Sequence, residues 1–198
     1  MRPRIFALMA AIFALPSFAL AVEVVPLLGV GQVEGEGTQE VQPSILVGGS
    51  LGLPLSETWS LHGQLVYQDV DFDVPDGVTA DGSVIFVNAA PLARVAGGLT
   101  EAFELRLGPA VGLAWYSASA SNSQSDAEVS ALFLHAGVQA ALFFRVTEDL
   151  RLGPFLHYAW LFPQRACFKT SGVEVCEDDP EREDQTYVSG SIALTLDL

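Results

Sequence analysis

Hydrophobic and polar positions alternate along most of this chain. The clearest run covers residues 103–116, where every second residue from Phe103 to Trp115 is apolar and the intervening positions include Glu104 and Arg106. Strict alternation of this length predicts a β-strand with one wholly apolar face. At ~3.3 Å per residue and a tilt of ~40°, the strand would span ~30 Å, the thickness of the apolar core of a bilayer.

The same alternation recurs often enough to predict a chain built from strands alone. The first of the further strands is the weakest, because Leu27 and Leu28 are adjacent and leave its outward face ambiguous. The further segments with this pattern are residues 24–33, 44–53, 59–68, 85–95, 132–145, 150–160 and 187–198. Together with residues 103–116 they make eight predicted strands.

The connections between these strands alternate between short and long. Residues 54–58, 97–102 and 146–149 are short, whereas residues 34–42, 69–82, 117–128 and 163–185 are long. Short turns at one end and long loops at the other are typical of outer-membrane barrels. The pattern predicts an all-β fold, an eight-stranded antiparallel up-and-down transmembrane β-barrel, with both chain ends on the short-turn side.

Aromatic residues on the apolar faces lie at the strand ends, and aliphatic residues fill the middle. Two such girdles around an aliphatic belt favour a membrane barrel, because Trp and Tyr prefer the headgroup level. A soluble sandwich or lipocalin is the alternative, but it would turn its aliphatic face inward, where it needs no aromatic girdle. The other face holds Arg, His, Gln, Glu and Gly, which make a poor dry core. The predicted girdle residues are Trp59, Phe103 and Phe144 near short turns, and Tyr67, Trp115, Tyr158 and Trp160 near long loops.

On this architecture the chain resembles the small outer-membrane β-barrels of the OmpA-like or OmpX-like, porin-type family. The resemblance covers residues 22–198 and rests on the strand pattern, not on a local motif. It implies a location in the outer membrane, with the lipid bilayer as partner. Members commonly end in an aromatic residue that the assembly machinery recognises, whereas this chain ends in Leu198.

The N-terminal segment has the features of a cleaved signal peptide. Arg2 and Arg4 form a basic region, residues 5–15 are almost wholly apolar, and Ala19 and Ala21 frame a small-residue cleavage site. A membrane anchor is the alternative, but the apolar run is shorter than the ~17–25 residues that a spanning helix needs. Residues 1–21 are therefore predicted as the signal peptide, and residues 22–198 as the barrel domain.

Charge and composition limit the partners. The chain is 50% hydrophobic and only 17% charged, with a net charge of -15, which becomes -17 when Arg2 and Arg4 are removed. This charge argues against nucleic acid as a partner. The predicted loops are acidic, through Glu34, Glu36, Glu40 and residues 177–184. One interpretation is a solvated surface whose charge repels neighbouring molecules, and the alternative is a binding surface for an extracellular ligand or divalent cations. Residues 69–73 begin like a calcium loop, but Val74 stands where that motif needs glycine.

A group of charged residues is predicted to face the bore near the short turns. Its members are Arg94, Glu104, Arg106, Arg145 and Arg151. Buried charges must be paired or hydrated, so the favoured interpretation is a structural ion network that plugs the bore. An anion-attracting constriction is the alternative. Inward phenylalanines such as Phe86 and Phe133 argue against an open pore, since the bore of an eight-stranded barrel is just filled by side chains.

The histidines and cysteines have structural interpretations. His62, His135 and His157 are all predicted to face inward and to satisfy polar neighbours, because no nearby Ser and acid complete a catalytic group. Cys167 and Cys176 lie close together in a polar stretch, and in an exported protein a disulfide is the expected state. Two thiols without a nearby histidine are too few ligands for a metal site.

These features predict an outer-membrane protein with a structural or surface-interaction role and with no catalysis, cofactor or metal. The alternative is a narrow porin-like channel or a small-ligand carrier. The assigned faces also predict that arginine at Leu107 or Val111 impairs membrane assembly. Serine at Gly112, on the inward face, is expected to matter much less.

Overall fold

The computed structural model describes residues 22–34, 42–70, 79–97, 102–121, 126–178 and 185–197. Within these ranges nearly every residue belongs to a strand, and no helix is long and apolar enough to cross a membrane. Residues 1–21, predicted as a signal peptide, lie outside the described residues, as do the predicted loop acids Glu36 and Glu40.

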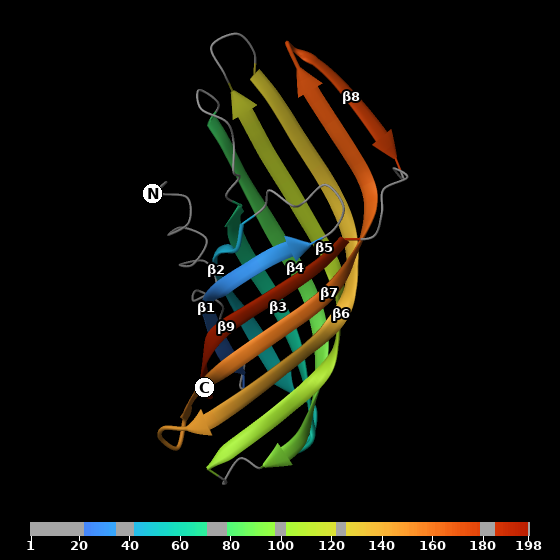
Figure 1. Cartoon of the computed structure of the whole chain (residues 1–198). Helices are drawn as coiled ribbons and strands as arrows, with labels where there is room; N and C mark the ends of the chain where they lie inside the picture. The colour runs from blue at the N-terminus through green and yellow to red at the C-terminus, as the bar shows by residue number, and fades with distance from the viewer. Residues whose placement is uncertain are drawn as a thin grey trace.

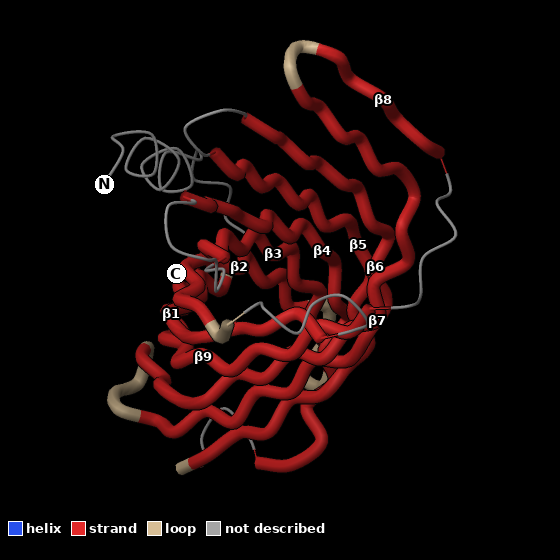
Figure 2. Tube along the Cα trace, turned by 45° about the horizontal axis from the view of Figure 1, so that its top comes forward, coloured by secondary structure: helices blue, strands red, loops and turns tan. Residues whose placement is uncertain are grey.

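Eight strands pair in a closed antiparallel ring, as Figures 1 and 2 show. The ring runs β6-β5-β4-β3-β2-β1-β9-β7 and closes through the β6–β7 pairing, while β8 pairs only with β7. This confirms the predicted eight-stranded antiparallel barrel. The strands are β1 (Glu23–Glu34), β2 (Ser44–Pro54), β3 (Trp59–Val70), β4 (Thr79–Gly97), β5 (Phe103–Ser121), β6 (Asp126–Arg145), β7 (Leu150–Thr170), β8 (Val173–Asp178) and β9 (Gln185–Asp197).

The aliphatic faces of the strands point outward, and the polar faces line the bore. Along β5, Leu107, Val111 and Leu113 are exposed, whereas Glu104 and Arg106 are buried. Because side chains alternate between the two faces of a strand, this assignment extends along the ring strands. It is interrupted near the short-turn end of β4, where the pairing register with β5 shifts between Arg94 and Ala96. The exposed aliphatic belt is formed by Leu28, Val30, Ile45, Leu61, Ile85, Val87, Leu107, Val111, Leu113, Leu134, Val138, Leu152, Leu156, Val188 and Ile192.

The structure settles the orientation of β1, which the sequence leaves ambiguous. Val25 and Leu27 are buried in the bore, and Leu28 and Val30 are exposed. The pairing of Leu27 with Gly48 on β2 and with Ala193 on β9 fixes this choice, because a one-residue shift would exchange the two faces. The same parity carries Glu23 into the bore.

The bore is packed, and this corrects the expectation for Gly112. A Cβ atom at this position would lie 2.0 Å from the carbonyl oxygen of Val87 and 2.7 Å from Cα of Asn88 on the neighbouring strand. Serine at Gly112 is therefore not a mild change, because the backbone of β4 would have to move. Aromatic side chains fill much of the space nearby, and Phe86, Phe143 and Tyr187 are almost wholly buried.

The wall of the barrel is taller on one side. The strands β4, β5, β6 and β7 have 19, 19, 20 and 21 residues, whereas β1, β2 and β3 have 12, 11 and 12. Parts of three segments predicted as loops instead continue the strands. Residues 69–70 and 79–82 belong to β3 and β4, residues 117–121 and 126–128 to β5 and β6, and residues 163–170 and 173–178 to β7 and β8. The long-loop ends of β4 to β7, together with β8, form a sheet that protrudes above the bore (Figure 1). This protruding sheet consists of residues 79–83, 117–121, 126–130, 165–170 and 173–178.

Candidate functional site

Glu104 is the centre of a buried ion network at the short-turn end of the bore. Its carboxylate accepts hydrogen bonds from Nε of Arg94 at 2.8 Å and from Nε of Arg106 at 2.6 Å, and it also pairs with Arg151. Only 1% of the Glu104 side chain is exposed. The geometry resembles a structural plug, since each charge has an opposite charge within contact distance.

A second carboxylate, Glu23, completes the network from the first strand. Arg106 forms a two-pronged contact with it, in which Nη2 lies 2.7 Å from Oε1 and Nη1 contacts Oε2. Nε2 of His62 lies 3.6 Å from Oε2 of Glu23, and Arg151 approaches the same carboxylate at 3.8 Å. Sequence reasoning missed Glu23, which lies at the start of the strand with the least regular pattern; its inward parity with Val25 is the signal that identifies it.

Arg145 does not join this network, in contrast to the prediction. It has the inward parity of Phe143 but is the last residue of β6, at the rim of the barrel. Its Nε donates a hydrogen bond to the carbonyl oxygen of Thr147 at 3.2 Å, so the side chain serves the β6–β7 turn. Among the described residues, the network therefore holds three arginines and two glutamates, with a net charge of +1.

Uncharged polar groups fill the next level of the bore. The side-chain oxygen of Gln64 accepts hydrogen bonds from the amides of Asn88 and Gln139, both at 2.8 Å. Beyond them, the rings of Phe86, His135, His157 and Tyr187 pack edge to face or tilted, with centroids 4.2–6.5 Å apart. The three histidines all lie in the bore, and His135 packs on His157, whereas His62 belongs to the ion network. The expectation that no serine and acid lie near a histidine is wrong for His62, because its Nδ1 lies 3.1 Å from Oγ of Ser50 and its Nε2 lies 2.9 Å from Oγ of Ser60, beside Glu23.

Two cavities lined by described residues of these levels are small. One beside His157, Tyr187 and Phe155 holds about 10 Å³ for the centre of a water-sized sphere, and one beside Arg94 and Trp59 holds about 20 Å³. A single water molecule needs ~10–15 Å³ by this measure. Neither cavity has room for a small organic ligand.

The predicted girdle residues lie on the outside, near the two ends of the aliphatic belt. Trp59, Phe103 and Phe144 are exposed near the short turns, and Phe103 pairs with Phe144 across β5 and β6. Near the long-loop end, Trp115 and Trp160 are exposed, and Trp160 packs edge to face on Tyr158 with ring centroids 5.0 Å apart. Tyr67 donates a hydrogen bond to Oδ1 of Asp69 at 2.7 Å. This arrangement places amphipathic rings between the apolar belt and the polar rim.

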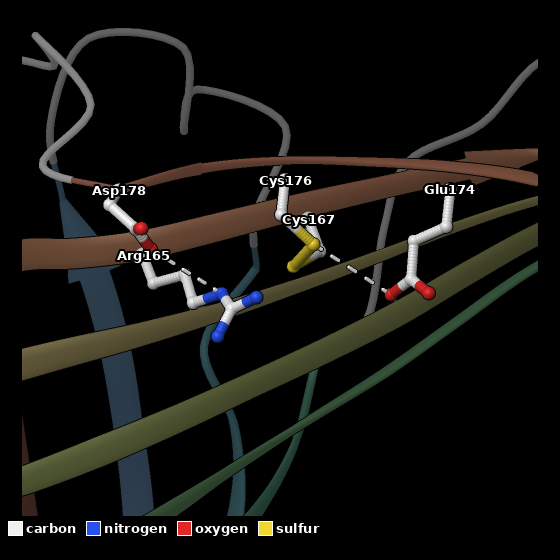
Figure 3. The surroundings of a disulfide bond; sticks show 5 residues. All are labelled: Arg165, Cys167, Glu174, Cys176 and Asp178. Carbon is white, nitrogen blue, oxygen red and sulfur yellow. Dashed lines mark hydrogen bonds and ion pairs between the residues drawn. A yellow bond between two sulfur atoms is a disulfide. The ribbon is translucent and has the colours of Figure 1, made fainter.

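The disulfide between Cys167 and Cys176 is present and joins β7 to β8 (Figure 3), as predicted. The two residues are direct cross-strand partners with Cα atoms 4.0 Å apart. Ser171 and Gly172 close the hairpin in the left-handed conformation, with φ of 50° and 81°, which suits a tight two-residue turn. Arg165 pairs with Asp178 at 3.5 Å on the same hairpin.

No cation site is built from the described acidic residues. Glu174 lies near the sulfurs of Cys167 and Cys176, but both sulfurs belong to the disulfide and are not thiolate ligands. Of the candidate calcium-loop residues, Asp69 is held by Tyr67, while Asp71 and Asp73 lie outside the described residues, as does most of the acidic run 177–184.

Comparison with known proteins places this fold in one class. No protein-family model matches the sequence, and no curated protein matches it significantly. Among solved structures, a major outer membrane protein from Thermus thermophilus superposes with a TM-score of 0.65 at 12% identity, covering 90% of this chain and 100% of that chain. The attachment invasion locus protein Ail of Yersinia pestis gives 0.60 at 11% identity, with 90% and 99% covered.

Neisserial surface protein A superposes with a TM-score of 0.58 at 13% identity, covering 89% of this chain and 97% of that chain. At such identities the likeness concerns the fold. The chain thus has the fold of the small outer-membrane β-barrels, the OmpA-like and OmpX-like type.

Proposed function

We propose that this chain is exported through a cleaved signal peptide, residues 1–21, and resides in the outer membrane of a Gram-negative-type cell. There it acts without catalysis, as a structural barrel whose long-loop end takes part in surface interactions. The outward aliphatic belt supports the membrane location. Leucine, valine and isoleucine exposed all around a barrel need an apolar surrounding, and the aromatic residues at both ends suit the headgroup regions.

The packing of side chains in the bore favours a surface role over a channel. The ion network around Glu104 spans the bore at one level, and amide and aromatic layers follow it. Each of Arg94, Arg106 and Arg151 is paired with a carboxylate, so none of these guanidinium groups is free to attract a passing anion. A porin-like channel or a small-ligand carrier would need this packing to open.

The protruding sheet supports an outward-directed role. It adds ordered surface that the barrel does not need for crossing a bilayer, and a disulfide fixes its last hairpin. A disulfide also fits an exported protein, since oxidising compartments preserve it.

Two measurements on the refolded protein test this proposal. We expect the unboiled protein to migrate differently from the boiled one on a gel, because a closed barrel resists the detergent. In planar bilayers we expect no stepwise conductance. Identical migration would refute the barrel in a membrane, and reproducible single-channel steps would favour the channel. Localisation is tested separately, by membrane fractionation and surface labelling of intact cells.

A further inference from the structure

The polarity of the sheet inverts where the strands rise above the aromatic residues. Below this level the outward face is apolar and the inward face is polar. Above it, the residues that continue the inward face are mostly apolar or small, and the exceptions on β7 and β8 are Thr170 and Glu177. Two rows of cross-strand partners cover this inner face: Gly82, Ala118, Val129, Phe168 and Val175, and then Ala80, Ala120, Ala127, Thr170 and Val173.

The outer face of the same sheet is polar throughout. Its rows are Ser83, Ser117, Ser130, Cys167 and Cys176, and then Asp81, Ser119, Glu128, Lys169 and Glu174. Lys169 donates a hydrogen bond to Glu128 at 2.7 Å, which raises the pKa of the lysine. This face is suited to water and sugar-like polar surroundings, so the apolar belt does not continue upward.

A bulge in β7 produces the inversion on that strand. The pairing register with β6 shifts between Leu132 and Phe133, where Gln164 is the additional residue. One extra residue exchanges the two faces of a strand, so Phe168 points over the bore instead of outward. The inner face that results is open: 48% of Phe168, 64% of Val173 and 65% of Val175 are exposed.

The charge around this apolar face limits what covers it. The described residues of the protruding sheet include six acidic residues and two basic ones, a net charge of -4. Both basic residues are already paired, Arg165 with Asp178 and Lys169 with Glu128. Glu177 lies on the inner face itself, beside Val175 in the next row, and no partner for its carboxylate occurs among the described residues.

We propose that the inner face of the protruding sheet docks a cationic amphipathic polypeptide segment, in which apolar residues that cover Phe168 and Val175 are flanked by a lysine or arginine that pairs with Glu177. The inference rests on the surface-interaction role proposed above and gives that role a partner chemistry. An acidic partner is repelled, and so is a second copy of this chain, which would bring the same negative charge to the interface.

Binding of defined peptides to the full-length protein in zwitterionic phosphatidylcholine nanodiscs tests this proposal. The probe is a dye-labelled peptide of alternating leucine and lysine, and the matched peptide replaces lysine with glutamate. Fluorescence anisotropy is measured against nanodiscs without protein, whose signal is subtracted. We expect the lysine peptide to bind with an affinity that falls as salt rises, and the glutamate peptide not to bind.

Two pairs of variants locate the site. Phe168→Ser should weaken binding about tenfold, as truncation of a central apolar contact does, whereas Ser119→Ala on the outer face should change it by less than about twofold. Glu177→Gln and Glu174→Gln remove the same charge from opposite faces of β8. Docking on the inner face predicts a loss of about threefold or more for Glu177→Gln alone.

Three other outcomes would overturn the proposal, and each points to a different explanation. Equal losses for Glu177→Gln and Glu174→Gln would mean general attraction to an acidic rim. Binding of both peptides, or of neither, would refute the cationic partner, and a dimer in sedimentation that Phe168→Ser dissociates would favour self-association. Gel migration and conductance of the same preparations are measured in parallel, so failure of the docking idea is distinguished from failure of the barrel assignment.

Discussion

Replacing Glu104 with glutamine should destabilise the barrel more than any single change at its surface. The wild-type carboxylate accepts hydrogen bonds from Arg94, Arg106 and Arg151, and all four side chains lie inside the bore or at its rim. Glutamine keeps the shape but loses the charge, so the net charge of the network rises from +1 to +2. The amide NH₂ group of the glutamine would also face the N–H groups of the arginines, and both groups are hydrogen-bond donors.

The expected size follows from these contacts. A hydrogen bond to a charged group contributes about 1.5–3 kcal/mol, and about two of the three bonds to Glu104 are lost or reversed. Breaking a buried ion pair by removing one partner typically costs about 3–5 kcal/mol. We therefore expect Glu104→Gln to lower the free energy of unfolding by about 3–5 kcal/mol. Adding Arg94→Gln should recover part of this loss, because it removes one uncompensated charge.

Urea unfolding of the refolded barrel in phospholipid vesicles, followed by tryptophan fluorescence, measures this difference. Trp59, Trp115 and Trp160 lie near the two ends of the belt and report loss of the folded state. Glu174→Gln is the matched control, because this carboxylate is exposed on β8. If the free energies of unfolding of Glu104→Gln and Glu174→Gln lie within about 0.5 kcal/mol of each other, the ion network does not stabilise the barrel as its geometry implies.

Three further predictions follow from the same structure. Val111→Arg should lower the free energy of unfolding by about 2–4 kcal/mol, because this side chain lies in the middle of the outward belt, whereas Ser119→Arg on the same face above the belt should have little effect; vesicle-based unfolding compares them. Gly112→Ala should lower the free energy of unfolding by about 1–3 kcal/mol. Gly63→Ala should not lower it, because no atom lies within 4 Å of the added Cβ, and equal free energies of unfolding for the two variants would contradict this reasoning. Cys167→Ser should expose the β7–β8 hairpin to protease while the rest of the barrel stays resistant, since closing so short a loop stabilises the hairpin by about 2–3 kcal/mol; unchanged cleavage would argue against the role of the disulfide.

The sequence determined the fold class because a strand has a period of two. Which residues face outward along residues 103–116 follows from parity alone, and the outward leucines and inward arginines exclude a soluble core. The alternation of short and long connections indicated the strand count. The closeness of Cys167 and Cys176 along the chain, together with the predicted signal peptide, was enough to predict their disulfide.

Only the tertiary structure decided which inward residues meet. Glu23 and Arg106 are 83 positions apart, and their contact depends on the register around the closed ring, which parity does not specify. Arg145 has the correct parity, but its place at the end of β6 turns it to the rim. Gly112 looks replaceable in the sequence, yet the backbone of the next strand lies too close for a side chain.

The protruding sheet shows most directly where sequence reasoning stops. Residues 117–128 and 163–185 look like polar loops, because their hydrophobic positions are small or widely spaced and a bulge at Gln164 interrupts the alternation. Pairing with a neighbouring strand keeps the described parts of these segments extended, and the hydrophobic pattern of the sequence does not show that pairing. Parity along the sequence thus indicates which side of a regular strand faces the lipid. The tertiary structure decides the orientation of β1, and the register of the closed barrel determines which distant side chains meet one another.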